Sequence, residues 1–512
     1  MQVTGGRRRA ASAFAIACAG LVAACTPGQA PAPAGTSASA TRTWGTLAFK
    51  PCSLTSPFAT TSIEAQCTTL QVPEDAARAD GRRIGLNIAW LPATSETASA
   101  ADPVVFLAGG PGQAATEAWP AVDAAFAEVR KHRGVLLVDQ RGTGRSHPLR
   151  CKDAEGNNAF TADPDDLSAA SARTFAQACA AALDADPRHY TTTDAVRDLE
   201  RVRVAVGAPQ LNLVGGSYGT RVAQQYAATH PSRVRTVVLD GVVPNTLVLG
   251  SEHARNLDAA LAAQFDRCQR LPACRARFGS DIRAQLRTLM QRLEAAPVEV
   301  AFTDPMTGAA RTDTATSGHV AALTRMFAYT PQAAALLPLV LDEAQAGRYA
   351  PLMALSDLVT RQVGGQINHG MQLSVICAED AGELGTRAVA DADTVLGAAM
   401  SDVLVAQCAA WPTGTRPAAF RAPLKTDAPV LLLSGEFDPV TPPRYGEEVA
   451  RHLPNGRHLV LRGQGHGTFA VGCTPKLLAR FIDTADAKAL DAKCLDSLDY
   501  VPPFTGFNGW EP

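Results

Sequence analysis

The sequence predicts an α/β fold: a mostly parallel β-sheet flanked by helices, with an inserted helical lid. Short apolar runs that end in glycine-rich loops alternate with segments of helical periodicity, which predicts parallel strands covered on both faces. From about Asn245 to Lys425 the sequence has mostly helical periodicity and is rich in Ala and Leu, and the alternation of predicted strands and loops returns after Lys425. We therefore expect a first core segment at 44–245, a lid insertion at 246–425, and a second core segment with a C-terminal tail at 426–512.

The first 43 residues are expected to lie outside the fold. Arg7–Arg9 precede the apolar run Ala10–Ala24, the layout of an export signal over residues 1–24. The run ends in LVAAC and resembles the lipobox of bacterial lipoproteins, in which Cys25 becomes the acylated first residue; a plain signal peptide cut near the later alanines is the alternative. Residues 25–43, rich in Pro, Ala, Ser and Thr, predict a disordered tether. The expected location is the periplasm or cell envelope with a lipid anchor, or otherwise secretion.

Composition excludes several classes of protein. The chain has 512 residues, 46% of them hydrophobic, which is ample for a core. The formal net charge of −2 provides no basic field for nucleic acid. Beyond the N-terminus no stretch is long and apolar enough to span a bilayer, so any membrane attachment is expected through a lipidated Cys25. The sequence does not indicate an oligomeric state.

Cysteine usage agrees with export. Of 12 cysteines, Cys18 and Cys25 belong to the leader, and the remaining ten fall in close pairs along the chain. Sequence alone does not determine connectivity, but each pair occupies one local segment, so sequential pairing in an oxidising compartment is expected. The expected pairs are Cys52 with Cys67, Cys151 with Cys179, Cys268 with Cys274, Cys377 with Cys408, and Cys473 with Cys494. No spacing suggests a metal, and no cofactor is expected.

The first half of the chain shows the strand–helix alternation element by element. RRIGLNIAWLPA alternates like a strand, and buried strands are predicted at Val104–Leu107, before AGGPGQ, and at Val135–Val138, before DQRGTGRS. TTDAVRDLERVRVAVG has helical periodicity, with N-cap oxygens available from Thr193 and Asp194 and a stop at Gly207.

The stretch LNLVGGSYGT places a serine where a predicted strand ends and a helix begins. Gly215-Gly216-Ser217-Tyr218-Gly219 fits G-x-S-x-G. A turn this sharp strains the dihedral angles of Ser217 and requires glycine on both sides, and it lifts Oγ towards the N–H groups at the start of the helix. An ordinary surface loop is the alternative. The apolar strand before the motif and the helix after it favour a nucleophile elbow.

A serine nucleophile needs a base, and the base needs an acid to orient it. His466 lies in GQGHGT, a glycine-rich loop after the predicted strand HLVLRG, whereas His458 begins that strand and is expected at the surface. Asp438 ends the strand PVLLLSGEFD, and Glu436 is its rival as the acid. Ser217, Asp438 and His466 each follow a predicted strand, and their order along the chain is that of α/β-hydrolases. They are the predicted catalytic triad.

Oxyanion donors are expected from two loops. One is the backbone N–H of Tyr218, directly after the nucleophile. The other belongs to the AGGPG loop, with Gly110 as first choice and Gly109 as second; a tight turn without this role is the alternative. Glycines there let the backbone approach a substrate carbonyl closely.

The motifs together carry a family resemblance over nearly all of the chain after the leader. They are GGPG from Gly109, DQRGTGRS from Asp139, GGSYGT from Gly215, VLDGVVP from Val238, GEFDPVTP from Gly435 and GHG around His466. The chain resembles the α/β-hydrolase group of prolyl iminopeptidases and tripeptidyl aminopeptidases, peptidase family S33, and its secreted bacterial branch in particular. The family often has His before Gly-Gly-Pro-Gly, where this chain has Ala108.

The resemblance implies an aminopeptidase that acts on peptides with a free N-terminus. It also implies that acidic side chains of the lid hold the substrate ammonium, for which Glu379 and Asp380 in MQLSVICAEDAGE are the candidates. An ordinary solvated acidic turn is the alternative for this pair. Asp139 and Arg141 are expected to structure their loop. A carboxylesterase or lipase of the same fold is the alternative function, because one triad serves both kinds of bond.

Overall fold

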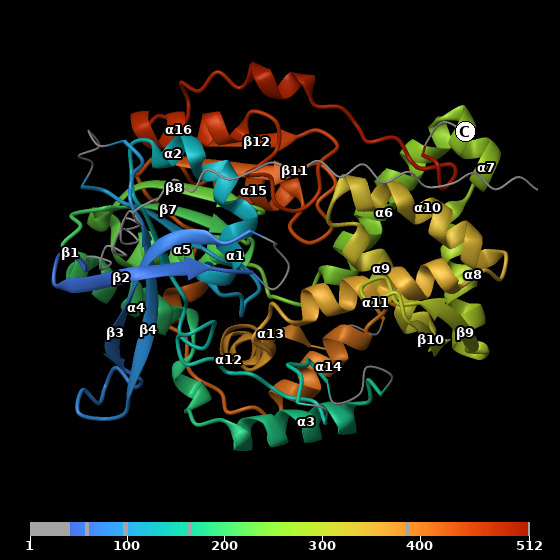
Figure 1. Ribbon diagram of the computed structural model, residues 1–512, viewed down its shortest axis with the longest axis horizontal. Helices are drawn as coiled ribbons and strands as arrows, with labels where there is room; N and C mark the ends of the chain where they lie inside the picture. Colours follow the sequence, from blue (N-terminus) through green and yellow to red (C-terminus); the bar gives the residue numbers. More distant parts are fainter. Residues whose placement is uncertain are drawn as a thin grey trace, which may run out of the picture. The chain divides into compact units, whose positions relative to one another are not determined.

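A ten-stranded sheet dominates the computed structural model, which describes residues 41–56, 61–95, 101–154, 156–161, 166–385 and 389–509, without the side chains of 362–364 (Figure 1). Its strand order is β1-β2-β3-β4-β6-β5-β7-β8-β11-β12. The strands are β1 (Arg42–Trp44), β2 (Leu47–Leu54), β3 (Ile63–Pro73), β4 (Arg83–Leu91), β5 (Val104–Leu107), β6 (Val135–Val138), β7 (Leu211–Gly216), β8 (Val234–Asp240), β11 (Val430–Gly435) and β12 (Gly456–Leu461). Pairing is antiparallel from β1 to β6 and parallel from β6 to β12. The predicted mostly parallel sheet is confirmed.

The N-terminal boundary needs a correction. The predicted signal peptide, Cys25 and residues 26–40 lie outside the described residues. Arg42 and Thr43, assigned to the tether, instead form β1 with Trp44, and Arg42 pairs with Phe49 of β2. The polar, Thr-rich composition of this segment conceals an edge strand that needs no buried face of its own.

Helices cover both faces of the sheet because its central strands are largely apolar on both faces, β5 and β6 at every position. Val104 and Phe106 of β5 belong to one cluster of buried side chains, and Val105 and Leu107 belong to another, as the two-residue period of a strand requires. Helices α1, α2 and α16 contribute to the first cluster, and α3, α4 and α5 to the second. These helices are α1 (Ala115–Val122), α2 (Ala127–Arg130), α3 (Ala169–Ala182), α4 (Thr192–Val206), α5 (Tyr218–Thr229) and α16 (Thr474–Thr484).

Helix α4 shows how the local sequence determines a helix start. Its N-cap is Thr191, whose hydroxyl accepts from the N–H of Asp194, and Asp194 reaches back to complete a capping box. The expected N-cap positions, Thr193 and Asp194, are therefore wrong by two or three residues. Gly207 ends the helix in the left-handed conformation, as predicted.

The helical insertion lies between β8 and β11, and it has two parts. Helices α6 to α11 and a hairpin, β9–β10, enclose their own cluster of buried side chains, to the right of the sheet in Figure 1. Helices α12 to α14 instead pack into the core beside α3 and α4. The elements are α6 (His253–Arg270), α7 (Pro272–Phe278), α8 (Ile282–Ala295), β9 (Val298–Thr303), β10 (Ala310–Ala315), α9 (Ser317–Phe327), α10 (Pro331–Gln345), α11 (Ala350–Gly364), α12 (His369–Glu379), α13 (Ala381–Leu384) and α14 (Ala399–Cys408).

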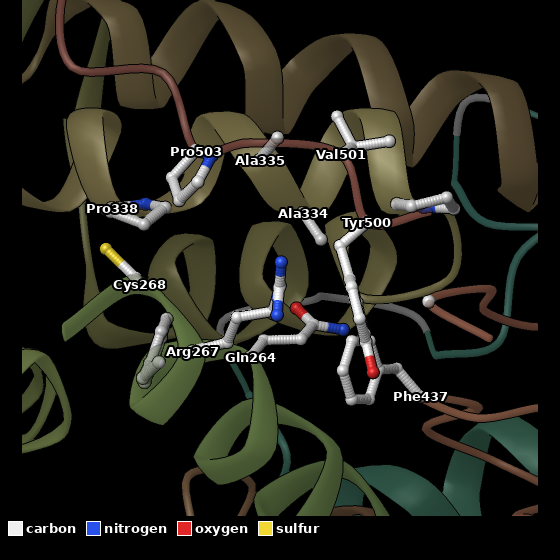
Figure 2. Close-up of a pocket in the computed structure, with 13 residues that line it drawn as sticks. Gln264, Arg267, Cys268, Ala334, Ala335, Pro338, Phe437, Tyr500, Val501 and Pro503 are labelled. Carbon is white, nitrogen blue, oxygen red and sulfur yellow. The ribbon is translucent and has the colours of Figure 1, made fainter. Parts of the chain in front are cut away.

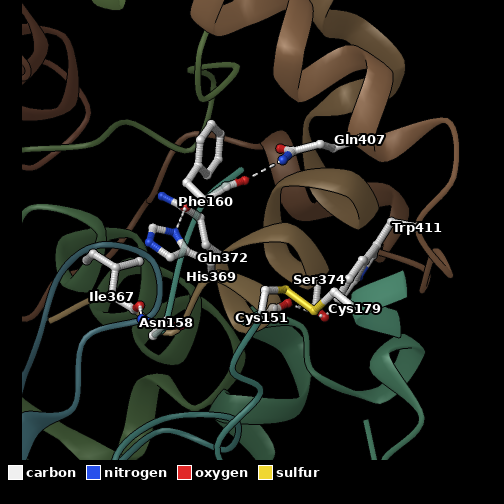
Figure 3. The surroundings of a disulfide bond; sticks show 11 residues. Cys151, Asn158, Phe160, Cys179, Ile367, His369, Gln372, Ser374, Gln407 and Trp411 are labelled. Carbon is white, nitrogen blue, oxygen red and sulfur yellow. Dashed lines mark hydrogen bonds between the residues drawn. A yellow bond between two sulfur atoms is a disulfide. The ribbon is translucent and has the colours of Figure 1, made fainter. Parts of the chain in front are cut away.

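Five disulfides join the ten cysteines in the sequential pairs expected from their spacing. Figure 3 shows Cys151–Cys179, which ties the loop after β6 to α3. The same loop contacts the insertion, because Gln407 of α14 donates to the carbonyl of Phe160 at 2.7 Å. Disulfides of this number are a feature of exported proteins. None of the helices in the described ranges combines the length and apolar character that a membrane crossing requires.

The C-terminal tail runs from the core onto the insertion. After α16 and the Cys473–Cys494 disulfide, Tyr500 stacks on the Arg267 guanidinium at 3.5 Å and lies 5.7 Å from the ring of Phe437 (Figure 2). Together with α6 and α10, the tail lines a pocket of about 40 Å³. The tail therefore connects the insertion to the loop that follows β11.

Candidate active site

The serine lies on a sharp turn between β7 and α5. Ser217 has φ 52° and ψ −125°, a strained conformation for a residue with a side chain. A Cβ on Gly215 would lie 2.5 Å from the carbonyl oxygen of Gly219, and a Cβ on Gly219 would lie 2.1 Å from that of Leu107. Both distances are too short for any larger residue. The glycines of the motif thus have the steric role that the elbow prediction assigned to them.

The glycine-rich loop after β5 lies directly against this turn. A Cβ on Gly109 would lie 3.0 Å from Cβ of Ser217, and Gly110 has φ 105°, which favours glycine. The backbone N–H groups of Gly110 and Tyr218 donate to no acceptor among the described residues. Two N–H groups beside the serine hydroxyl are what an oxyanion hole requires.

Asp438 and His466 form a hydrogen-bonded pair. Nδ1 of His466 lies 2.7 Å from Oδ2 of Asp438. The carboxylate also accepts from the backbone N–H groups of Val440 and Thr441 and from the Thr441 hydroxyl, each at 2.8 Å. Thr441 Oγ1 is also 3.1 Å from Nδ1 of His466. The acid is therefore held rigidly, and Nε2 is the imidazole nitrogen left for a substrate-side partner.

The electrostatics of this pair suit a base and its orienting acid. Burial opposes ionisation of Asp438, but His466 and the surrounding hydrogen bonds outweigh it and lower the pKa of the carboxyl. Burial likewise favours a neutral imidazole, yet the charge and hydrogen bond of Asp438 outweigh it and raise the pKa of His466. Asp438 thus stays ionised and stabilises the protonated ring.

Glu436, the alternative acid, and His458, the other histidine near His466 in the sequence, have hydrogen-bonding partners outside the Asp438–His466 pair. Glu436 accepts from the N–H of Gly463 at 2.7 Å and from the Tyr500 hydroxyl at 3.2 Å. His458 contacts the hydroxyl of Ser434 at 2.9 Å. The structure therefore favours Asp438 over Glu436 as the acid.

The serine and the histidine converge on the end of β8. The N–H of Ser217 donates to the carbonyl of Asp240 at 2.8 Å, and a Cβ on the next residue, Gly241, would lie 2.9 Å from Cε1 of His466. Among the described residues, Ser217 Oγ has no hydrogen-bonding partner. The direct bond between Ser217 and His466 is thus not formed in this conformation, and such bonds often tighten only in the substrate complex.

Three residues around His466 were missed by the sequence reasoning. The buried Asp240 accepts from Thr468 N–H at 2.6 Å and hydroxyl at 2.9 Å, which holds the loop after His466. The backbone carbonyl of Tyr329, in the insertion, accepts a hydrogen bond from the backbone N–H of His466 at 2.8 Å, and the centres of the two side-chain rings lie 5.4 Å apart. Asp240 lies in the motif VLDGVVP and Thr441 in the motif GEFDPVTP, so both could have been picked out from the motifs that carry the family resemblance. Nothing in the sequence singles out Tyr329.

Glu379 and Asp380 lie side by side at the end of α12, but their contacts differ. Glu379 accepts from the N–H of Thr192 at 2.6 Å and from its hydroxyl at 2.9 Å. Asp380 pairs with Arg221 at 3.0 Å and with Arg421 at 2.8 Å. Both carboxyl groups are buried, so the alternative of a solvated acidic turn is wrong. Their predicted contact with a substrate ammonium stays a prediction, and the positive charge beside Asp380 is already supplied by arginine.

Asp139 and Arg141 support loops, in agreement with the role expected of them. Asp139 is fully buried and accepts from Thr116 N–H and hydroxyl, each at 2.9 Å. Arg141 pairs with the buried Asp198 at 2.7 Å. Within the described ranges, no group of three or more His, Cys, Asp or Glu side chains is arranged to hold a metal ion.

Comparison with known families agrees with this geometry. Residues 102–329 match the family described as alpha/beta hydrolase fold, and residues 393–494 match the family described as TAP-like protein. The chain has the α/β-hydrolase fold. The two matches, with the relatives described next, support the resemblance to peptidase family S33.

The relatives of this α/β-hydrolase include peptidases. It is 27% identical over 480 residues to serine protease Hip1 of Mycobacterium tuberculosis, which covers 87% of this chain and 90% of that protein. It is 33% identical over 190 residues to a tripeptidyl aminopeptidase of Streptomyces lividans, which covers 35% of each chain. A proline iminopeptidase of Neisseria gonorrhoeae is 34% identical over 141 residues, 27% of this chain and 32% of that protein.

Proposed function

We propose that this S33 serine hydrolase is an exported aminopeptidase that releases residues from peptides with a free N-terminus. The relatives' names support a peptidase, and the tripeptidyl aminopeptidase and proline iminopeptidase among them favour attack near the N-terminus. The observation that carries the proposal is the position of the Asp438–His466 pair, at the same edge of the sheet as the strained Ser217. In open α/β sheets this edge, beyond the carboxyl ends of the parallel strands, is where ligands bind.

In the first half-reaction Ser217 forms an acyl-enzyme. Its Oγ attacks the scissile carbonyl while Nε2 of His466 takes the hydroxyl proton, and Asp438 holds the ring and stabilises the imidazolium. The N–H groups of Gly110 and Tyr218 bind the oxyanion of the tetrahedral intermediate. His466 then returns the proton to the leaving amine as the C–N bond breaks.

In the second half-reaction water replaces the amine. His466 takes a proton from water, whose oxygen attacks the acyl carbon, and the same N–H groups bind the second oxyanion. Collapse of this intermediate breaks the ester bond and returns the proton to Ser217. The released acyl portion carries the original N-terminus, and no cofactor takes part.

The experiment is a panel of unblocked peptide anilides carrying one, two or three residues, with and without N-terminal proline. Each is compared with its N-acetyl form and with a simple ester, in wild type and in Ser217→Ala. The proposal predicts turnover of the free-amine anilides that disappears in Ser217→Ala and falls strongly on acetylation. Equal turnover of free and acetylated peptides contradicts the aminopeptidase, and ester turnover alone favours the carboxylesterase or lipase.

We also propose that Cys25 carries a lipid that anchors the protein to the cell envelope. The support is the LVAAC sequence at the end of an export signal. Fractionation of cells that produce wild type or Cys25→Ser tests it, with the mass of the mature N-terminal peptide as a second readout. The variant should leave the membrane fraction while its disulfides and activity persist. An unmodified Cys25, or its removal with the leader, contradicts the anchor.

A further inference from the structure

The side chain of Tyr218 makes contacts that the reaction described above does not use. Tyr218 is the first residue of α5 and its side chain is fully buried. Its hydroxyl lies 2.6 Å from Thr192 Oγ1 and accepts from Nε2 of Gln140 at 3.2 Å. A buried hydroxyl with two partners is held in one position.

The contacts continue to the insertion. Thr192 opens α4, and it donates both its N–H and its hydroxyl to the carboxyl group of Glu379, on α12. With Glu379 ionised, the Thr192 hydroxyl donates to Glu379, so the Tyr218 hydroxyl donates to Thr192. We call Gln140, Tyr218, Thr192 and Glu379 the Tyr218 link.

The link ends at the proposed oxyanion hole. Tyr218 donates its backbone N–H there, one residue from the nucleophile. Its side chain is held by the loop after β6 and by α4, and α12 acts on it through Thr192. Because displacement of a reacting geometry by about 1 Å can cost about a hundredfold in rate, the position of this residue matters to the reaction.

We propose that the Tyr218 link positions the oxyanion N–H of Tyr218, and that Thr192 and Glu379 are positioning residues of the hydrolase. The proposal rests on the acyl-transfer function proposed above. It also gives the insertion a part in the chemistry: α12 holds the nucleophile turn through two side chains.

The link competes with the ammonium-binding role expected for Glu379. Both carboxyl oxygens of Glu379 are already occupied by Thr192, and the residue is 2% exposed. Burial raises the pKa of Glu379 to about 8, with Asp380 adding to the shift and Arg221 opposing it. A carboxyl group whose ionised form is disfavoured by burial is a weaker partner for an ammonium.

The test uses Tyr218→Phe and Thr192→Val, which keep the size of each side chain and remove one hydroxyl from the link. Tyr226→Phe is the matched control, because Tyr226 is also buried on α5 and donates to Glu200 at 2.7 Å. Substrates are an unblocked peptide anilide and an ester without an amine. The rate of labelling by a fluorophosphonate and the Tm of each variant are measured alongside.

If the oxyanion N–H of Tyr218 is no longer held in position, kcat should fall by about tenfold on both substrates with KM unchanged. The rate of fluorophosphonate labelling of Ser217 should fall by a similar factor. The double variant should be no slower than the slower single variant, since the two hydroxyls act as one unit. Tyr226→Phe should lose stability without this loss of kcat. Link variants whose kcat stays within about twofold of Tyr226→Phe overturn the proposal.

Glu379→Gln separates the two roles of that residue. Glutamine keeps an acceptor for the Thr192 N–H and a donor for its hydroxyl but carries no charge. The link predicts KM for the free-amine substrate within about threefold of wild type. A KM raised about tenfold or more for that substrate alone overturns the link in favour of ammonium binding. If Ser217→Ala is inactive while the link variants match the control, the link fails and the proposed function stands; activity that persists in Ser217→Ala overturns both.

Discussion

Asp438 and Asp380 are both buried aspartates at the ends of secondary-structure elements, yet their surroundings differ completely. Asp438 contacts one histidine and three hydrogen-bond donors of its own loop, so its partner can gain and lose a proton. Asp380 contacts Arg221 and Arg421, whose charges are permanent. A carboxylate beside a titratable group can take part in proton transfer, whereas one between two guanidinium groups holds the structure together.

The roles of Asp438 and Asp380 were also predicted from two different kinds of sequence evidence. Asp438 was selected because it follows a strand of a parallel sheet, and such positions meet at one edge. Glu379 and Asp380 were selected because the family resemblance implies acidic side chains in the helical insertion, where sequence position carries no comparable geometric rule.

Asp438→Asn should lower kcat by about 10³–10⁴-fold, because the amide cannot stabilise the imidazolium and favours the wrong tautomer of His466. Its matched control is Glu436→Gln, two residues earlier, which should leave kcat within about threefold of wild type. Steady-state kinetics on a free-amine peptide anilide measure both. Equal losses in the two variants would show that the acid has been assigned to the wrong residue.

Asp380→Asn should mainly reduce stability. It leaves the fully buried Arg221 without its counter-charge and removes one of the two carboxylates beside Arg421, which should cost about 3–5 kcal/mol in the free energy of unfolding. Denaturant unfolding with the disulfides intact measures the loss, and kcat per folded molecule should fall by less than about tenfold. Glu128→Gln, which removes an exposed pair with Lys131, is the control and should change stability little. An Asp380→Asn variant that keeps full stability but loses activity would show that Asp380 acts in the reaction rather than in holding the structure together.

The pH profile should reflect the Asp438–His466 pair. Only neutral His466 can accept the serine proton, so kcat/KM should fall as the pH drops through its pKa. Because Asp438 raises that pKa, the midpoint should lie above the usual 6.5. In the residual activity of Asp438→Asn the midpoint should move to lower pH, since the cause of the shift is gone. An identical midpoint in both proteins would argue that another group controls the acid limb.

Thr441→Val should have the smallest effect, about tenfold or less in kcat, because it removes one of several hydrogen bonds that hold Asp438. The pH midpoint should shift little, since the charge of Asp438 remains. Thr484→Val, an exposed threonine on α16, serves as the control and should match wild type. A loss in Thr441→Val as large as that in Asp438→Asn would give the hydroxyl a more direct role.

Local patterns predicted much of the sheet and the nucleophile turn. β5 and β6 occupy the predicted residues, because a short apolar run bounded by glycine or polar loops has few other stable arrangements. The glycines around Ser217 were assigned correctly for a steric reason that acts within a few residues and against one neighbouring strand.

Long-range partners could not be predicted from spacing. Arg221, which pairs with Asp380, lies 159 residues away on the elbow helix, and Tyr329 contacts His466 from the segment of the insertion between α9 and α10. The N-cap of α4, Thr191, was not predicted because the adjacent polar residues also offer side-chain oxygens that can cap a helix. β1 was missed because an exposed edge strand needs no apolar pattern.

The most direct measurement is peptide mapping after fluorophosphonate labelling of the folded protein, with residual peptidase activity followed in the same samples. We expect a single adduct, on Ser217, whose appearance parallels the loss of activity and which is much slower to form in Asp438→Asn. An unlabelled Ser217 in fully inhibited protein, or complete labelling of Ser217 with activity intact, would contradict it.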